Sequence, residues 1–263
     1  MDINHAIDSF LSFQSVERNA SSLTVNAYSK DLIELVEYAE ADKVNSVGQI
    51  DYFLLRGFVA DLYDRGLAKS TIERKIATIR SWFNYLYKKR VIEENPARML
   101  KFPKKEKKLL SVFPYEDIEK LLNAPEEENA AYYRDSLILE LLYGTGVRVS
   151  ELTGLNVADI DFSGQRLRIR GKGKKERILP LAKFHVDLIK SYLTSIPSML
   201  QKGSTPDSEA LILNRRGGRL SSRNVLEMVK QYLNKTALPD TYSPHSFRHT
   251  FASHLLAAGA DLR

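Results

Sequence analysis

Apolar residues recur at helical spacing in four stretches of the first hundred residues. The first two stripes begin at Ile3 and Val25, where apolar side chains return every three or four positions. A third stripe runs from Ile50 to Tyr63 and ends before Gly66, and glycine is the residue that most readily adopts the left-handed conformation at a helix end. The pattern predicts a bundle of short helices at the start of the chain.

The fourth stripe is the most regular, and its other faces are basic. Ser70 and Glu73 have the spacing of a capping box, and apolar residues then recur on one face from Ile72 to Leu86. The other faces carry Arg74, Lys75, Arg80, Lys88, Lys89 and Arg90. We expect a helix with one buried side and one exposed basic side.

The rest of the chain mixes helical stripes with a short alternating pattern. Helices are expected at 115–122, 135–143, 147–155, 184–196, 223–234 and 245–258. Arg166–Arg170 alternates basic and apolar residues with period two, and Arg177–Leu181 follows a glycine-rich turn, which predicts two antiparallel strands. The fold class expected is mainly α with a small antiparallel β-sheet, in which an N-terminal helical bundle precedes a mixed α/β domain.

A domain boundary is expected where the bundle ends at Asn95-Pro96, because the residue before a proline is pushed out of the helical region. We assign residues 1–100 to the helical domain, 101–111 to a basic linker and 112–263 to the second domain. Lys101–Lys108 holds five lysines and one glutamate. This segment is explained either as an ordinary linker or as a strand of chain that lies along a phosphate backbone.

Composition excludes several kinds of site and several classes of protein. The chain has 263 residues and no cysteine, so disulfides and thiolate zinc sites are excluded. No apolar run approaches the roughly 20 residues that a membrane span needs, and the first ten residues include Asp2 and Asp8 rather than a basic signal segment. We expect a soluble protein of the cytoplasm with no membrane partner.

The net charge of +6 is concentrated in three islands: residues 69–90, 101–108 and 166–177. Residues 1–68 are acidic by contrast, with eleven acidic and five basic side chains. One basic island is explained equally well by a solvated surface. Three islands together favour a polyanionic partner such as nucleic acid.

Three clusters of the second domain combine residues suited to phosphate chemistry. Arg148 follows the glycine break Gly144-Thr145-Gly146, Lys172 lies between two glycines at the hairpin tip, and His245 and Arg248 share a helix face. Each cluster has a simpler explanation. Arg148 is placed to pair with Glu151, Gly-Lys-Gly is a common turn, and His254 suits surface packing. His245 and His249 have metal-pair spacing, but the adjacent Arg248 repels a cation, so no metal is expected.

Together, the order of these clusters resembles a known family. The segments LLYGTGVRVSEL (141–152), RGKGKKER (170–177) and HSFRHTFA (245–252) resemble the tyrosine site-specific recombinases of the lambda-integrase family, most closely the Xer-type chromosome dimer resolvases. The resemblance extends to Tyr28–Asp31 and to the helix at Ser70–Arg80. It implies that the helical bundle is a SAM-like core-binding domain and that the second domain is a tyrosine-recombinase catalytic domain.

The resemblance also implies a mechanism and a set of site residues. A tyrosine oxygen attacks a DNA phosphodiester and forms a 3′-phosphotyrosine, so the bond energy is kept and no cofactor is needed. Arg148 and Arg248 match the arginines that clamp the phosphate, and Lys172 matches the lysine that protonates the leaving oxygen. His245 matches a histidine that assists proton transfer or orients the phosphate. Glu151 is expected to hold Arg148.

The family pattern places its nucleophilic tyrosine after the His245 motif, where this chain has none, since Tyr242 precedes the motif. We expect a truncated recombinase that binds DNA without cleaving it and is a monomer in solution. The alternative is a natural non-catalytic DNA-binding derivative that occupies a recombination site. For the complete protein, the resemblance implies chromosome dimer resolution at a dif-like site by a tetramer on paired half-sites, with a paralogue and a DNA-translocase activator as possible partners.

The basic islands supply the candidate DNA contacts. They are Arg74, Lys75, Arg80, Lys104, Lys105, Lys174, Arg177 and Arg223. The helices at 70–90 and 223–234 are candidates for the major groove, although either is also explained as an ordinary amphipathic helix. We expect the two domains, joined by Lys101–Lys108, to form a C-shaped clamp around duplex DNA.

Overall fold

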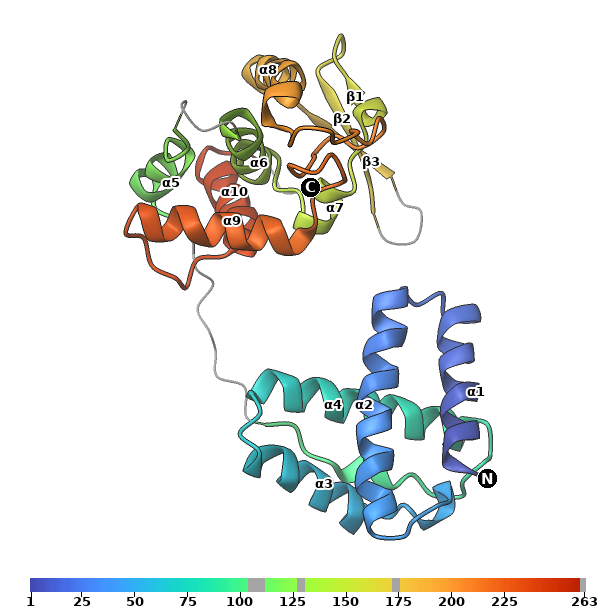
Figure 1. Cartoon of the computed structure of the whole chain (residues 1–263). Helices are drawn as coiled ribbons and strands as arrows, with labels where there is room; N and C mark the ends of the chain where they lie inside the picture. The colour runs from blue at the N-terminus through green and yellow to red at the C-terminus, as the bar shows by residue number, and fades with distance from the viewer. Residues whose placement is uncertain (104–111, 127–130, 172–175, 261–263) are drawn as a thin grey trace. The chain divides into compact units, whose positions relative to one another are not determined.

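The computed structural model describes residues 1–103, 112–126, 131–171 and 176–260. The chain divides into two compact units, Met1–Lys107 and Lys108–Arg263, and each is described by itself (Figure 1). The fold class expected from the sequence is confirmed, since the structure is mainly helical with one small antiparallel sheet. Among the described residues, no helix combines the length and apolar character needed to cross a membrane.

The first unit is a helical bundle. Its helices are α1 (Ile3–Val16), α2 (Ser22–Ala41), α3 (Tyr52–Asp64) and α4 (Lys69–Lys88), with short 3-10 turns at Val47–Gln49 and Pro96–Met99. Helices α1 and α2 pack side by side, and α4 packs against both (Figure 1). The side chains of Asp2, Ser21 and Asp51 accept hydrogen bonds from the first backbone N–H groups of α1, α2 and α3.

Helix α4 supplies much of this core. The apolar stripe from Ile72 to Leu86 is buried, which confirms the expected periodicity. The expected capping box is wrong: α4 begins at Lys69 after Ala68, so Ser70 lies inside the first turn. The bundle also continues past Pro96, because Ala97 and Leu100 are buried in the same core.

The second unit contains six helices and a three-stranded sheet among its described residues. The helices are α5 (Tyr115–Leu122), α6 (Tyr132–Thr145), α7 (Val149–Thr153), α8 (Lys183–Met199), α9 (Ser222–Lys235) and α10 (Pro244–Ala257). The strands are β1 (Ile160–Asp161), β2 (Arg166–Arg170) and β3 (Glu176–Pro180), antiparallel in the order β1-β2-β3. The sequence reading missed β1, because two residues are too few to show alternation.

Helix α6 lies at the centre of this unit, against α8 and α10 (Figure 1). It is buried on nearly all sides, as the run Leu137, Ile138 and Leu139 shows, and this explains why it lacks a polar face. In β2, Leu167 and Ile169 are buried while the three arginines that alternate with them are exposed, so the alternation predicted for this strand is confirmed.

The beginning of the second unit is fastened to α10. The backbone N–H of Phe113 donates to Thr250 Oγ1 at 2.9 Å. The buried ring of Phe113 stacks on Tyr242, with the ring centres 3.9 Å apart, and contacts Phe247 at 5.2 Å. The segment that starts this unit therefore holds the N-terminal half of α10.

Candidate functional site

Two glycines at the end of α6 bring neighbouring helices close. The helix runs through Gly144 and ends at Thr145, with Gly146 as a left-handed cap at φ +59°, so the expected break falls at Gly146 alone. A Cβ atom at Gly146 would lie 2.6 Å from Phe251 Cδ1 of α10, and one at Gly144 would lie 2.6 Å from His185 Nε2 of α8. Hydrogen at these positions permits the close packing of α8 and α10 on α6.

Arg148 caps the start of α7, directly after this turn. Its backbone N–H donates to Glu151 Oε2 at 2.9 Å, and its Nη1 donates to Glu151 Oε1 at 2.9 Å. The salt bridge expected between these two residues is confirmed. The Arg148 side chain is 54% exposed, whereas that of Glu151 is only 6% exposed, so the carboxylate is an inner anchor and the guanidinium faces outward.

Glu151 also binds Arg177 of β3, a contact that the sequence reading missed. Arg177 Nη1 donates to Glu151 Oε1 at 2.9 Å, and Nη2 donates to Oε2 at 2.7 Å. Burial raises the pKa of Glu151, but the hydrogen bonds from Arg177 and Arg148 outweigh it and lower the pKa to about 2. The prediction that Arg177 contacts DNA stays untested, but two N–H groups of its guanidinium are bonded to Glu151 and its side chain is 35% exposed.

Helix α10 presents the third cluster. Pro244 occupies its first position, His245 is exposed, and Arg248 is half-buried. Arg248 Nη1 donates to the backbone carbonyl of Gly146 at 2.6 Å. The structure thus anchors Arg248 on the turn that leads into Arg148, so one short segment holds both arginines.

Several predicted site residues lie outside the described part of the chain. These are Lys172, Lys174, Lys104 and Lys105. Within the described ranges, no group of three or more His, Cys, Asp or Glu side chains is arranged to hold a metal ion. His254 is a packing residue: its ring stacks on Tyr115 with the centres 3.9 Å apart, and its Nδ1 lies 3.1 Å from Tyr143 Oη.

In the first unit, Lys75 is not on the exposed basic face, so that expectation is wrong. Its side chain is 5% exposed, and Nζ donates to Asp31 Oδ1 at 3.1 Å and to Glu34 Oε2 at 2.5 Å. Arg74 reaches the same carboxylate of Asp31 from a more exposed position, and Thr78 Oγ1 donates to Asp31 Oδ2 at 2.8 Å. The acidic partners lie on α2, which local sequence patterns do not reveal.

The other candidate cations stay on the surface or at its edge. Arg80 lies over the ring of Phe102, with its guanidinium carbon 5.1 Å from the ring centre. Arg223, near the start of α9, is highly exposed and pairs with Glu227 one turn later. An exposed pair of this kind contributes little stability and readily exchanges its carboxylate for another anion.

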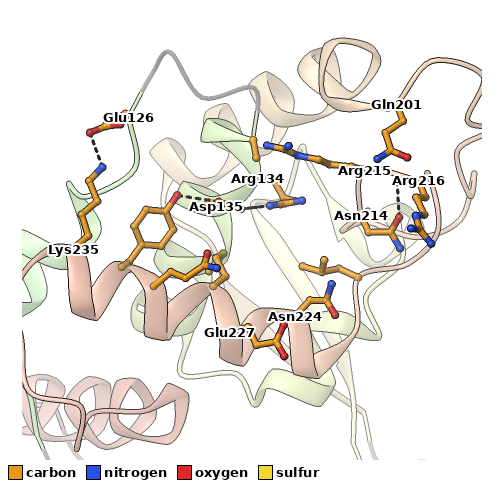
Figure 2. Close-up of a pocket in the computed structure, with 15 residues that line it drawn as sticks. Glu126, Arg134, Asp135, Gln201, Asn214, Arg215, Arg216, Asn224, Glu227 and Lys235 are labelled. Atoms are coloured by element: carbon orange, nitrogen blue, oxygen red, sulfur yellow. Dashed lines mark hydrogen bonds and ion pairs between the residues drawn. The ribbon is translucent and has the colours of Figure 1, made fainter.

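A cavity of about 730 Å³ lies elsewhere in the second unit, beside α9 (Figure 2). Asp135 accepts hydrogen bonds from Arg134 and from Tyr232, and Figure 2 shows the ion pair between Lys235 and Glu126. Burial and the adjacent charge of Asp135 raise the pKa of Tyr232. The arginines at the α6–α7 turn do not line this cavity. Arg148 is exposed and Arg248 is half-buried, an arrangement that suits contact with a long polymer rather than enclosure of a small molecule.

Comparisons with known proteins agree with this geometry. Residues 111–263 match the phage integrase family, and residues 7–90 match the phage integrase N-terminal SAM-like domain. The chain is 40% identical to tyrosine recombinase XerC of Syntrophus aciditrophicus, over 99% of this chain and 87% of that protein. It is 35% identical to tyrosine recombinase XerD of Staphylococcus epidermidis, over 99% of this chain and 88% of that protein.

Solved structures share the fold. A XerH recombinase bound to its palindromic difH substrate matches with a TM-score of 0.72 at 24% identity, over 93% of this chain and 72% of that one. A lambda integrase dimer bound to a core site matches with a TM-score of 0.73 at 18% identity, over 99% of this chain and 92% of that one. At these identities the likeness concerns the fold alone.

Proposed function

This chain belongs to the phage integrase family and is a Xer-type tyrosine recombinase, an enzyme of site-specific DNA recombination. From that premise we propose how its residues act on DNA. The anchoring of Arg148 and Arg248 on one turn carries the proposal. Phosphoryl transfer builds negative charge on the non-bridging phosphate oxygens, and two fixed guanidinium groups are well suited to stabilise that charge.

Each member of the site has a proposed role. Arg148 and Arg248 clamp the phosphate that is attacked, and His245 orients the phosphate or assists proton transfer. Lys172 protonates the leaving oxygen as a general acid. Glu151 touches no DNA in this scheme and holds Arg148. The attacking tyrosine forms a 3′-phosphotyrosine and frees a 5′-hydroxyl, which later attacks the phosphotyrosine to rejoin a strand, so the number of phosphate ester bonds is conserved.

The proposed substrate is a duplex with paired half-sites, similar to dif, and the proposed role is the resolution of chromosome dimers. The similarity to the relatives named tyrosine recombinase XerC and XerD, at 40% and 35% identity, supports a recombination substrate. Four protomers act on the paired sites, with a paralogue and a DNA-translocase activator as candidate partners. Contacts from the first unit include Arg80 and Arg74, whose side chains reach the surface, whereas buried Lys75 is not proposed as a contact.

The polypeptide of residues 1–263 is proposed to bind DNA as a monomer in solution without cleaving it. None of its tyrosines follows the His245 motif, where the family pattern places the nucleophile. Incubation with a bound duplex, followed by denaturing electrophoresis, tests this point. A covalent protein–DNA adduct formed by these 263 residues would contradict it.

Footprinting on a bound duplex, repeated at increasing salt, tests the function as a whole. We expect protection of half-sites and an affinity for the duplex that falls steeply as the salt concentration rises. The reason is that lysine and arginine side chains release the counterions of the phosphates that they contact. In a form of the recombinase that cleaves DNA, Arg148→Ala should abolish the covalent complex while leaving most of the duplex affinity. Salt-independent binding would contradict the DNA interface, and normal cleavage by Arg148→Ala would contradict the active site.

A further inference from the structure

One carboxylate is shared by two arginines in the second unit. Each oxygen of Glu151 accepts one hydrogen bond from Arg148 and one from Arg177, at distances from 2.7 to 2.9 Å. The two arginines differ in exposure, since the Arg177 side chain is 35% exposed and that of Arg148 is 54% exposed. Arg177 is therefore the inner cation, and Arg148 is the outer one.

The bond from Arg177 fixes the orientation of the carboxylate. A guanidinium that donates two parallel hydrogen bonds defines both the position and the plane of its partner. Helix α7, which carries Glu151, has only five residues, and so short a helix has little stability of its own. The link to β3 thus constrains Glu151 more firmly than α7 alone does, and Glu151 in turn fixes the backbone N–H and one guanidinium N–H of Arg148.

The same contact sets the local charge. Glu151 is ionised at neutral pH, since its pKa is about 2, and a single negative charge lies between two positive ones. The three side chains together carry one positive charge. Without Arg177, the buried carboxylate would cancel the charge of Arg148, and the outward guanidinium would attract a phosphate much less.

We propose that Arg177 is a positioning residue that acts through Glu151 to present a charged, oriented Arg148 to DNA. The inference rests on the proposed function, in which Arg148 contacts a phosphate. It replaces the sequence-based hypothesis that Arg177 contacts DNA itself. The two assignments differ in which phosphate loses its contact when Arg177 is changed.

Methylphosphonate scanning of the DNA distinguishes a positioning role of Arg177 from a direct contact between Arg177 and DNA. The wild-type chain first selects a tight-binding duplex from a random library, and each phosphate of that duplex is then replaced singly by a neutral methylphosphonate. Loss of one charge-assisted contact should weaken binding about tenfold. The phosphate held by Arg148 is the one whose replacement weakens the wild type but not Arg148→Met.

Arg177→Met should lose sensitivity at that same phosphate and at no other. Arg177→Lys keeps the charge without the fork, and we expect it to retain only part of the wild-type effect. Adding Glu151→Gln to Arg177→Met removes the charge that would cancel Arg148, and sensitivity should return. A purely structural defect would not be rescued in this way. Lys190→Met, at an exposed lysine of α8, is the matched control and should resemble the wild type.

The outcomes distinguish the inference from its premise. If no methylphosphonate weakens the wild-type chain, the proposed function fails and the inference fails with it. If the wild type is sensitive and Arg177→Met stays fully sensitive at the Arg148 phosphate, the inference alone is overturned. Sensitivity lost instead at a different phosphate assigns Arg177 to direct DNA contact. Circular dichroism and thermal unfolding of each variant verify that the fold is retained.

Discussion

The two units each contain a network of carboxylates and cations, and the networks differ in which member reaches the surface. In the first unit, Asp31 and Lys75 are both buried, and Asp31 accepts bonds from Lys75, Arg74 and Thr78. In the second unit, the carboxylate of Glu151 is buried, but Arg148 points outward. In the first network, the central cation Lys75 is buried and fully paired within the fold. In the second network, the cation Arg148 remains exposed and can bind an external anion.

This difference separates stability from function. A buried charge pair contributes modest net stability, yet removal of one member is costly because the other charge is left without compensation. An outward guanidinium contributes little to stability and keeps spare N–H donors. Changes in the first network should therefore affect unfolding most, and changes in the second should affect DNA binding most.

The largest effect should come from Asp31→Ala. The change removes the acceptor shared by Lys75, Arg74 and Thr78, and breaking a buried pair costs about 3–5 kcal/mol in the free energy of unfolding. Trp82, the one tryptophan of the chain, is buried in this unit, so its fluorescence during urea unfolding measures the loss. Asp8→Ala, at an exposed aspartate of α1, is the control. A loss below about 1 kcal/mol would refute the comparison.

The second-largest effect should come from acid, which weakens the network of Glu151, Arg148 and Arg177. The pKa of Glu151 is lowered from 4.5 to about 2 in the folded protein, so its stabilisation is present above pH 4.5 and is lost as the pH falls toward 2. The shift corresponds to roughly 3 kcal/mol. Hydrogen exchange of the α7 amides across this range measures the loss. Glu151→Gln is the control, because it lacks this titration, and an identical acid response in both proteins would rule out the assignment.

Arg65→Ala should have the smallest effect. Arg65 pairs with Glu34 at 2.9 Å and Asp61 at 3.2 Å, but its side chain is 48% exposed. Exposed pairs contribute little to the free energy of unfolding, so the urea unfolding curve followed by Trp82 fluorescence should shift only slightly. A loss as large as that of Asp31→Ala would mean that the edge of the network matters as much as its buried centre.

The sequence predicted elements whose patterns are local. Helix α5 and strand β2 have the predicted bounds, because amphipathic periodicity and alternation depend only on neighbouring residues. Among the described candidates for chemistry, Arg148, Glu151 and Arg248 came from a motif order that carries family information. The hydrogen bonds of these residues could not be predicted from the motifs. The pair Arg148–Glu151 is the exception, because its two members lie within one turn of helix.

The errors concern partners that are distant in the chain. Lys75 directly precedes Ile76 of the buried stripe, and its pairing with Asp31 and Glu34, on another helix, explains why its side chain turns inward. For Arg177, the strand pattern predicts exposure but does not show the carboxylate on α7 that the guanidinium binds, and its predicted contact with DNA stays untested. In both cases the sequence shows which residues are charged, but the carboxylate that each cation binds is evident only from the tertiary structure.

The fastening of Phe113 to α10 has a mechanical consequence. A displacement of Phe113 would act on α10 through the N–H bond to Thr250 and through the ring packed on Tyr242 and Phe247. Phe247 is adjacent to Arg248 on the same helix. The position of Phe113 and the orientation of the helix that holds His245 and Arg248 are therefore mechanically linked.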